Sequence, residues 1–151
     1  MEAFLLSVHV VAAILLVGPV AVTTSLFPRY APRTVPPSPD GASVRSLDAA
    51  RMLHRVTRVY GGLALVVPVV GLALATVQGR TTEIWILVAM GLTAVAGALL
   101  VLRITPLQQD ALDHPDDGAR LGRLSMLAGI FNLLWAVVVV LMIVRPGSDY
   151  S

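Results

Sequence analysis

The 151-residue sequence predicts an all-α, polytopic membrane protein built as a bundle of four transmembrane helices. Hydrophobic residues make up 56% of the chain and charged residues only 13%, a composition well outside that of soluble domains. Four apolar segments are each long enough to cross a hydrocarbon core about 30 Å thick. Because the charged residues lie almost entirely between these segments, we expect residues 1–151 to form a single transmembrane domain.

The first apolar segment, residues 4–27, contains no charge and one ionisable side chain, His9. Glu2 stands where a cleaved signal peptide would carry basic residues, so we expect a retained helix. Pro19 is expected to kink its second half. The proline-rich segment from residue 28 to residue 45 predicts an extended loop outside the membrane, because proline cannot continue a helical hydrogen-bond ladder.

The second span, residues 59–77, is expected to follow an amphipathic helix over residues 46–58. Ser46 is a good N-cap and Asp48 falls in the first turn, where the helix dipole favours an acidic side chain. One face of this amphipathic helix is basic, since i, i+4 and i+7 positions lie together; it carries Arg51, Arg55 and Arg58.

The third span, residues 84–102, follows a short turn, so spans two and three are expected to be antiparallel neighbours. A polar connection leads to the fourth span, residues 124–144. Small residues recur at helical spacing and predict close helix packing; they are Gly71 and Ala75, the row Ala89, Thr93, Gly97, and the row Ala94, Ala98.

Arginine positions predict the orientation. Nine of the eleven arginines fall on the two long connections and the amphipathic helix, and two, Arg80 and Arg145, fall on the other side. The positive-inside rule therefore places both long connections in the cytoplasm and both termini outside. Topology accounts for the basic charge without a nucleic-acid partner. The chain has neither Cys nor Lys, which excludes disulfides, thiolate metal sites and lysine Schiff bases.

His9 is the strongest candidate for chemistry, because an ionisable group at membrane depth is costly. Counting residues from the outer surface brings Met90 to the same depth. An imidazole and a thioether would suit Cu(I), another soft metal, or the axial positions of a haem. The alternative is a histidine that hydrogen-bonds a neighbouring helix through Ser7, Thr93 or a carbonyl. His54 is expected to lie too far away to assist.

Three other groups each have a functional and a structural interpretation. Asn132 and Trp135 could contact a ligand such as a quinone, or Asn132 could make an interhelical hydrogen bond. The arginine face could hold anionic lipid headgroups or an anionic substrate, or serve topology alone. An acidic cluster could gather a divalent cation or cap the following helix; it comprises Asp113, His114, Asp116 and Asp117.

Short motifs along the chain resemble those of a broad group of small bacterial membrane proteins. The first span, with SVHVVAA at residues 7–13 followed by Val17-Gly18, is similar to an "LHxxxA…xG" opening. The group includes copper-resistance-D-like proteins, HemJ-type protoporphyrinogen oxidases and an uncharacterised four-helix family common in actinobacteria. Further similarities lie at Leu53-His54-Arg55-Val56, Gly71, Phe131-Asn132 and Arg145-Pro146.

This resemblance implies a bacterial cytoplasmic membrane and, from the HemJ-type proteins, a b-type haem on His9. Span three lacks the further His and Lys residues of that family, and the uncharacterised family brings no activity. Two function classes therefore stand. One is a protein that binds haem b or a soft metal such as copper through His9, with Met90, Asn132 and Trp135 nearby, for redox chemistry or metal handling. The other is a non-catalytic accessory subunit, surrounded by lipid, that packs in a homo-oligomer or a larger membrane complex.

Overall fold

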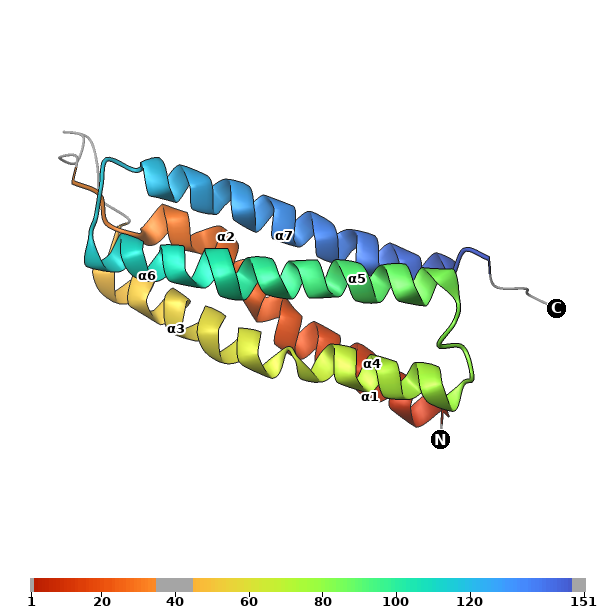
Figure 1. The fold of residues 1–151 in the computed structure, drawn as a ribbon. Helices are drawn as coiled ribbons and strands as arrows, with labels where there is room; N and C mark the ends of the chain where they lie inside the picture. Colours follow the sequence, from red (N-terminus) through yellow and green to blue (C-terminus); the bar gives the residue numbers. More distant parts are fainter. Residues whose placement is uncertain (1, 35–44, 148–151) are drawn as a thin grey trace.

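The computed structural model describes residues 2–34 and 45–147, and all regular structure within these ranges is helical. Four helical rods lie side by side, each long and apolar enough to cross a membrane (Figure 1). The fold class predicted from the sequence is confirmed. The rods consist of α1 (Glu2–Ala12), η1 (Ala13–Val17) and α2 (Gly18–Tyr30); α3 (Leu47–Leu63) and α4 (Val66–Val77); α5 (Ile84–Leu99), η2 (Leu100–Ile104) and α6 (Thr105–Asp113); and α7 (Ala119–Val144).

Prolines explain the irregularities inside three of the rods. Pro19 and Pro106 are each the second residue of a helix that follows a five-residue π-helical segment, η1 or η2. A proline ring clashes with the carbonyl four residues earlier, and a wider turn moves that carbonyl away. The second rod breaks between α3 and α4, and there the carbonyl of Ala64, four residues before Pro68, accepts from the Val67 amide at 3.0 Å. The irregularity expected from Pro19 therefore takes the form of η1.

The ends of the proline-rich connection are fixed by hydrogen bonds. Ser46 is the N-cap of α3, as predicted, and its Oγ accepts from the Ala49 amide at 3.3 Å. The boundary predicted at Pro28 is wrong, because α2 continues to Tyr30. The Arg45 guanidinium donates to the carbonyls of Pro28 and Ala31 and satisfies this helix end. The extended loop predicted for residues 35–44 lies outside the described residues.

The third rod continues beyond the span predicted from the sequence. The sequence predicted a polar connection after residue 102, but the helix runs through η2 and α6 to Asp113. Thr105-Pro106 does not end the rod, since proline is tolerated in the first turn of α6. The rod therefore brings the polar residues of α6 beside α3.

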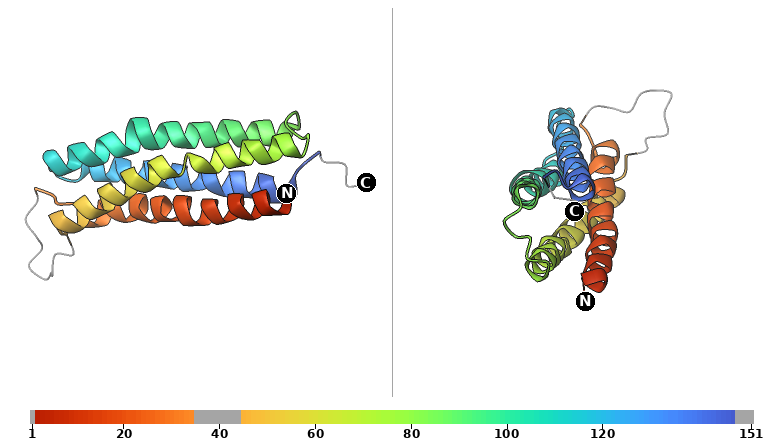
Figure 2. Two further views of the ribbon diagram at one scale, coloured as in Figure 1. Left: turned by 90° about the horizontal axis from the view of Figure 1, so that it is seen from below. Right: turned by 90° about the vertical axis from the view of Figure 1, so that its right-hand side faces the viewer.

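The four rods pack closely at one end of the bundle and separate into two pairs at the other. At the closed end, α2 packs against α3 and α7, and α3 packs against α6. The main core cluster is built largely from these helices and includes Phe27, Ile104, Leu124 and Phe131. At the other end, α1 packs on α4 and α5 packs on α7, so the pairs diverge (Figures 1 and 2).

Spans two and three approach each other at two places, one beside the turn that joins them and one toward the closed end, where Gly61 lies against Leu100. Trp85 and Ile86 at the start of α5 cluster beside the turn with Ala75 of α4 and Met142 of α7. Beyond that cluster α4 has α1 as its main partner. The expectation of antiparallel neighbours therefore holds beside the turn and again where Gly61 meets Leu100, and the two spans separate between these contacts because the helix pairs diverge.

Glycine packing differs in part from the sequence-based expectation. Gly97 has no heavy atom within 4 Å of where a Cβ would be, and Ala94 and Ala98 are exposed. On the second rod the close packing predicted at Gly71 is confirmed, and Gly61 makes a second close approach; at both positions an added Cβ would lie less than 3.0 Å from a neighbouring side chain. On α5 the small residues that are buried are Ala89, from the predicted row, and Ala96, whereas Gly97, Ala94 and Ala98 do not mark a tight contact.

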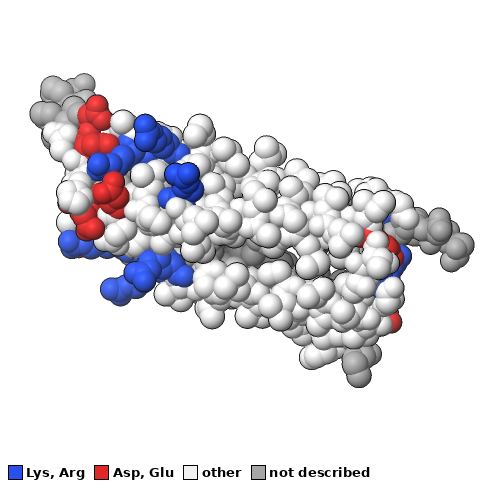
Figure 3. All heavy atoms as spheres, viewed as in Figure 1, with Lys and Arg blue, Asp and Glu red and all other residues white. Residues whose placement is uncertain are grey.

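Charged side chains gather at the two ends of the bundle and leave a broad uncharged band between them (Figure 3). The band carries many large exposed apolar side chains, among them Ile14, Val69, Leu87, Leu133 and Ile143. A surface of this kind needs lipid rather than water around it, and the helices satisfy their backbone groups internally. The molecule is a multi-pass membrane protein.

Candidate functional site

His9 is buried between α1 and α4, with 6% of its surface exposed. Its Nδ1 lies 3.0 Å from the carbonyl oxygen of Val67, so Nδ1 carries a proton and donates to that oxygen. The ring lies directly over Gly71, where a Cβ would come within 2.8 Å of the His9 Cε1. This is the arrangement expected of a histidine that hydrogen-bonds a neighbouring helix through a carbonyl.

Met90 lies in a different environment from His9. It is 38% exposed on α5, which pairs with α7, whereas His9 belongs to the α1–α4 pair. Within residues 2–34 and 45–147, no group of three His, Asp or Glu side chains is placed to hold a metal ion. Binding of haem b or copper at His9 stays a prediction, to be tested by an absorption spectrum and metal analysis of the purified protein.

Asn132 and Trp135 of α7 both make packing contacts, and ligand binding at these residues stays a prediction. The Asn132 amide donates to Ser25 Oγ on α2 at 2.9 Å, and that hydroxyl donates to the Ala21 carbonyl at 2.7 Å. Trp135 packs edge-on against Phe131, with ring centroids 6.3 Å apart. Asn132 Oδ1 and Trp135 Nε1 are buried without a hydrogen-bond partner among the described residues. The interhelical hydrogen bond predicted for Asn132 is confirmed.

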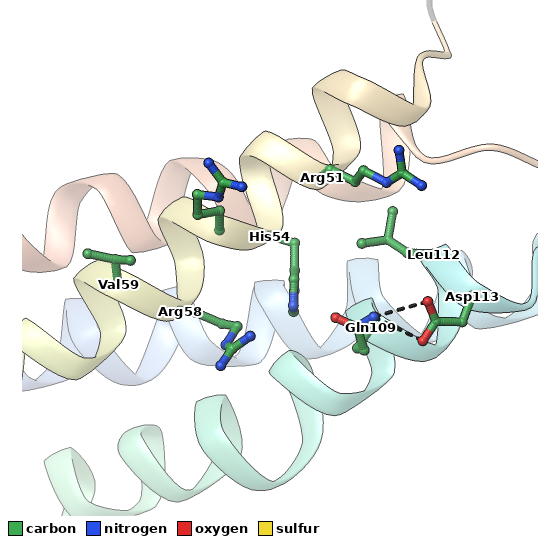
Figure 4. Close-up of a pocket in the computed structure, with 8 residues that line it drawn as sticks. Arg51, His54, Arg58, Val59, Gln109, Leu112 and Asp113 are labelled. Carbon is green, nitrogen blue, oxygen red and sulfur yellow. Dashed lines mark hydrogen bonds between the residues drawn. The ribbon is translucent and has the colours of Figure 1, made fainter.

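A basic pocket lies between α3 and α6 at the closed end of the bundle (Figure 4). Its volume is about 470 Å³. All three arginines of the predicted basic face contribute to it, and their side chains are exposed. The lining comprises Arg51, His54, Arg55, Arg58, Val59, Gln109, Leu112 and Asp113. Three guanidinium groups in one concave site create a positive potential that favours an anionic ligand.

His54 points from α3 into the space between the two helices (Figure 4) and is only 6% exposed. Its Nδ1 lies 3.0 Å from Gln108 Oε1. His54 Nε2 and Gln108 Nε2 are both buried and have no partner in the described part of the chain. An unpaired buried polar atom is costly, so a lining histidine whose Nε2 is buried and unpaired is a position where a ligand could bind.

The other wall of the pocket comes from α6. Gln109 Nε2 donates to both carboxylate oxygens of Asp113, at 3.1 and 2.9 Å (Figure 4). These two side chains are one helical turn apart and bring acceptor oxygens to the rim of a site that is otherwise cationic. The pocket therefore has a guanidinium wall and an acceptor wall.

Sequence reasoning missed the histidine and the α6 wall. His54 was assigned no role, although it follows Arg51 by three residues and precedes Arg58 by four, which is the spacing of one helix face. On α6, Asp113 was assigned to the acidic cluster, and Gln109 and Leu112 were missed because this segment was interpreted as a connection. The signal was the pair Gln108-Gln109 with Asp113 at i+4 from Gln109, a helical spacing in a polar segment.

Two members of the acidic cluster, Asp116 and Asp117, cap α7, as the structural interpretation predicted. Asp116 accepts from the amides of Gly118 at 2.8 Å and Arg120 at 3.2 Å, and Asp117 accepts from the Ala119 amide at 3.1 Å. The Gly118 amide, with the Arg120 amide and guanidinium adding to it, holds the pKa of Asp116 below its ordinary value, although partial desolvation opposes this. The carboxylates of Asp116 and Asp117 therefore accept hydrogen bonds from the amides at the start of α7.

The fold and the pocket together define a class: a small four-helix membrane protein with a basic, partly buried polar pocket at one end of the bundle. No protein-family model, curated protein or solved structure matches this chain. The pocket itself is therefore the basis for a functional assignment.

Proposed function

We propose that this protein is a non-catalytic membrane protein that binds anionic phospholipid headgroups in the α3–α6 pocket. The observation that carries the proposal is that three arginines from one face of α3 line a single pocket walled by α6. Arginine near an anionic membrane surface contributes about 1 kcal/mol per residue. Three of them together would favour an anionic over a zwitterionic headgroup by about 3 kcal/mol, or roughly 100-fold.

The depth of the pocket supports a lipid as the ligand. It lies at the closed end, where the arginines border the uncharged band of the bundle (Figure 3). A phospholipid beside the bundle would place its phosphate at that level while its chains cover the apolar surface. This role belongs to the accessory class of function and requires no redox centre.

The same proposal puts the pocket in the cytoplasmic leaflet. Nine of the eleven arginines lie on the connections and helix ends at the closed end of the bundle, and the positive-inside rule assigns that end to the cytoplasm. Cysteine substitution tests the orientation without interference, since the chain has no native cysteine. In intact cells, Thr82→Cys should react with an impermeant thiol reagent and Pro115→Cys should react only after lysis. The reverse labelling pattern would contradict this orientation.

Lipid binding is tested by measuring which lipids the purified protein retains and exchanges in mixed micelles. The protein should prefer phosphatidylglycerol to phosphatidylcholine, and the triple variant Arg51→Gln, Arg55→Gln, Arg58→Gln should lose most of that preference. Arg123→Gln is the matched control, because Arg123 is exposed on the first turns of α7 but does not line the pocket. An equal preference in the triple variant and the control would refute headgroup binding at this site.

A further inference from the structure

The pocket offers two kinds of hydrogen-bonding group on opposite walls, and a phosphate alone would use only one of them. The arginines on α3 are permanently charged donors with no acceptor atoms. Asp113 and Gln109 on α6 present carboxylate and amide oxygens toward the same space (Figure 4). An anion placed near the arginines offers no donor to the remaining lone pairs of the Asp113 carboxylate, which Gln109 Nε2 only partly satisfies, and the Asp113 charge would repel a second anionic group.

His54 adds an acceptor in the interior of the pocket. Gln108 Oε1 faces Nδ1 at 3.0 Å, so Nδ1 donates to it, and in the tautomer protonated at Nδ1 the lone pair is on Nε2. That atom is buried and has no partner within the described ranges. A ligand hydroxyl that donates to Nε2 would remove the cost of leaving it unpaired.

The size of the pocket agrees with a ligand larger than phosphate. Its volume of about 470 Å³ lies within the usual range for small-molecule sites, about 300–1,000 Å³. A phosphate with a short hydroxylated group attached would reach from the guanidinium wall to the acceptor wall.

We propose that the pocket recognises a polyol phosphate, with the phosphate on Arg51, Arg55 and Arg58 and the hydroxyls donating to His54 Nε2 and Asp113. This inference rests on the proposed function and deepens it, since it names the headgroup chemistry. The same chemistry is present in the phosphoglycerol headgroup of a lipid and in free glycerol phosphate. Because a site built to bind a hydroxyl disfavours an analogue that lacks it, we expect about a tenfold preference for the hydroxylated form, the size of one net hydrogen bond.

The test compares two lipids that carry the same charge. Phosphatidylglycerol and phosphatidylethanol are both phosphodiesters with one negative charge, and only the first has headgroup hydroxyls. Exchange of each lipid onto the full-length protein in mixed micelles gives their affinity ratio, with phosphatidylcholine as the uncharged reference. A ratio near ten is expected for the native chain, and a ratio near one would overturn the polyol inference.

Two variants connect the ratio to the acceptor groups. Asp113→Ala removes a negative charge, so it should bind both anionic lipids more tightly while the ratio falls towards one. His54→Phe keeps a ring of similar shape and should also lower the ratio while leaving the preference over phosphatidylcholine. If both variants keep the native affinity ratio of phosphatidylglycerol to phosphatidylethanol, His54 and Asp113 do not bind the headgroup hydroxyls and the inference fails.

The outcomes separate this inference from the proposed function. Equal binding of the two anionic lipids, with both bound better than phosphatidylcholine, overturns only the polyol inference. No preference for either anionic lipid overturns the proposed function as well. Free glycerol phosphate that binds as tightly as the lipid would support the polyol chemistry and assign it to a soluble ligand, against the lipid source.

Discussion

The contact between His9 and Gly71 allows a quantitative prediction about how the first two spans are held together. A Cβ at position 71 would lie 2.8 Å from Cε1 and 3.2 Å from Nδ1 of the His9 ring. The ring cannot turn aside cheaply, because it is buried and its Nδ1 donates to the Val67 carbonyl. Gly71→Ala should therefore displace the ring and weaken that hydrogen bond.

The expected cost follows from the two parts of this change. Overpacking a well-packed contact costs about 1–3 kcal/mol, and an interhelical hydrogen bond in a membrane contributes about 0.6 kcal/mol on average. Alanine in place of a helical glycine returns about 0.5–1 kcal/mol. We expect the free energy of unfolding to fall by about 1–3 kcal/mol, measured by circular dichroism during titration of the micelles with a denaturing detergent.

Two further variants make the reasoning refutable. Gly91→Ala is the matched control, because nothing lies within 4 Å of a Cβ at that helical position, and it should be neutral or slightly stabilising. In the double variant His9→Ala, Gly71→Ala the clash is absent, so the second substitution should add no further loss. If Gly71→Ala is as stable as Gly91→Ala, or if its cost persists without the histidine, the proposed packing is wrong.

Two other predictions concern the α7 cap and the interhelical amide. The pKa of folded Asp116 lies below its ordinary value. Its contribution to stability is therefore present above the ordinary aspartate pKa of about 4 and is lost as the pH falls through the lowered value. The unfolding midpoint of Asp116→Asn should depend less on acidification than that of the native chain, and identical pH profiles would contradict the capping role. Asn132→Leu removes both the hydrogen bond to Ser25 and the unpaired Oδ1. These two effects oppose each other, so the free energy of unfolding should change by less than about 1 kcal/mol. A large loss of stability in the same detergent titration would indicate a role beyond packing.

The fold was predictable from the sequence, because a helix that crosses a lipid bilayer needs a long apolar segment. The pocket was not predictable in this way. Long apolar segments and clustered arginines identified four spans without any knowledge of their contacts. The pocket depends on α6 continuing the third rod beyond Pro106, and the π-helical turn that permits this leaves no simple sequence pattern. The sequence predicted only that His54 lies too far from His9 to assist it, and the burial of His54 depends on the neighbouring helix that carries Gln108.

Depth counting also had a clear limit. It brought His9 and Met90 to one level, but level does not determine which helices pack together. The pairing of α1 with α4 satisfies His9 through a backbone carbonyl, and neither that pairing nor a carbonyl acceptor can be inferred from side-chain types.

The division of the open end into two helix pairs has a consequence for how the protein is made. The first two rods form one hairpin and the last two form another, and the hairpins meet mainly at the closed end. Each hairpin can enter the bilayer as a unit during synthesis, and the two can then associate laterally. A chain divided at the turn near Gly79, between the hairpins, should therefore retain the information needed to reassemble from two separately translated halves.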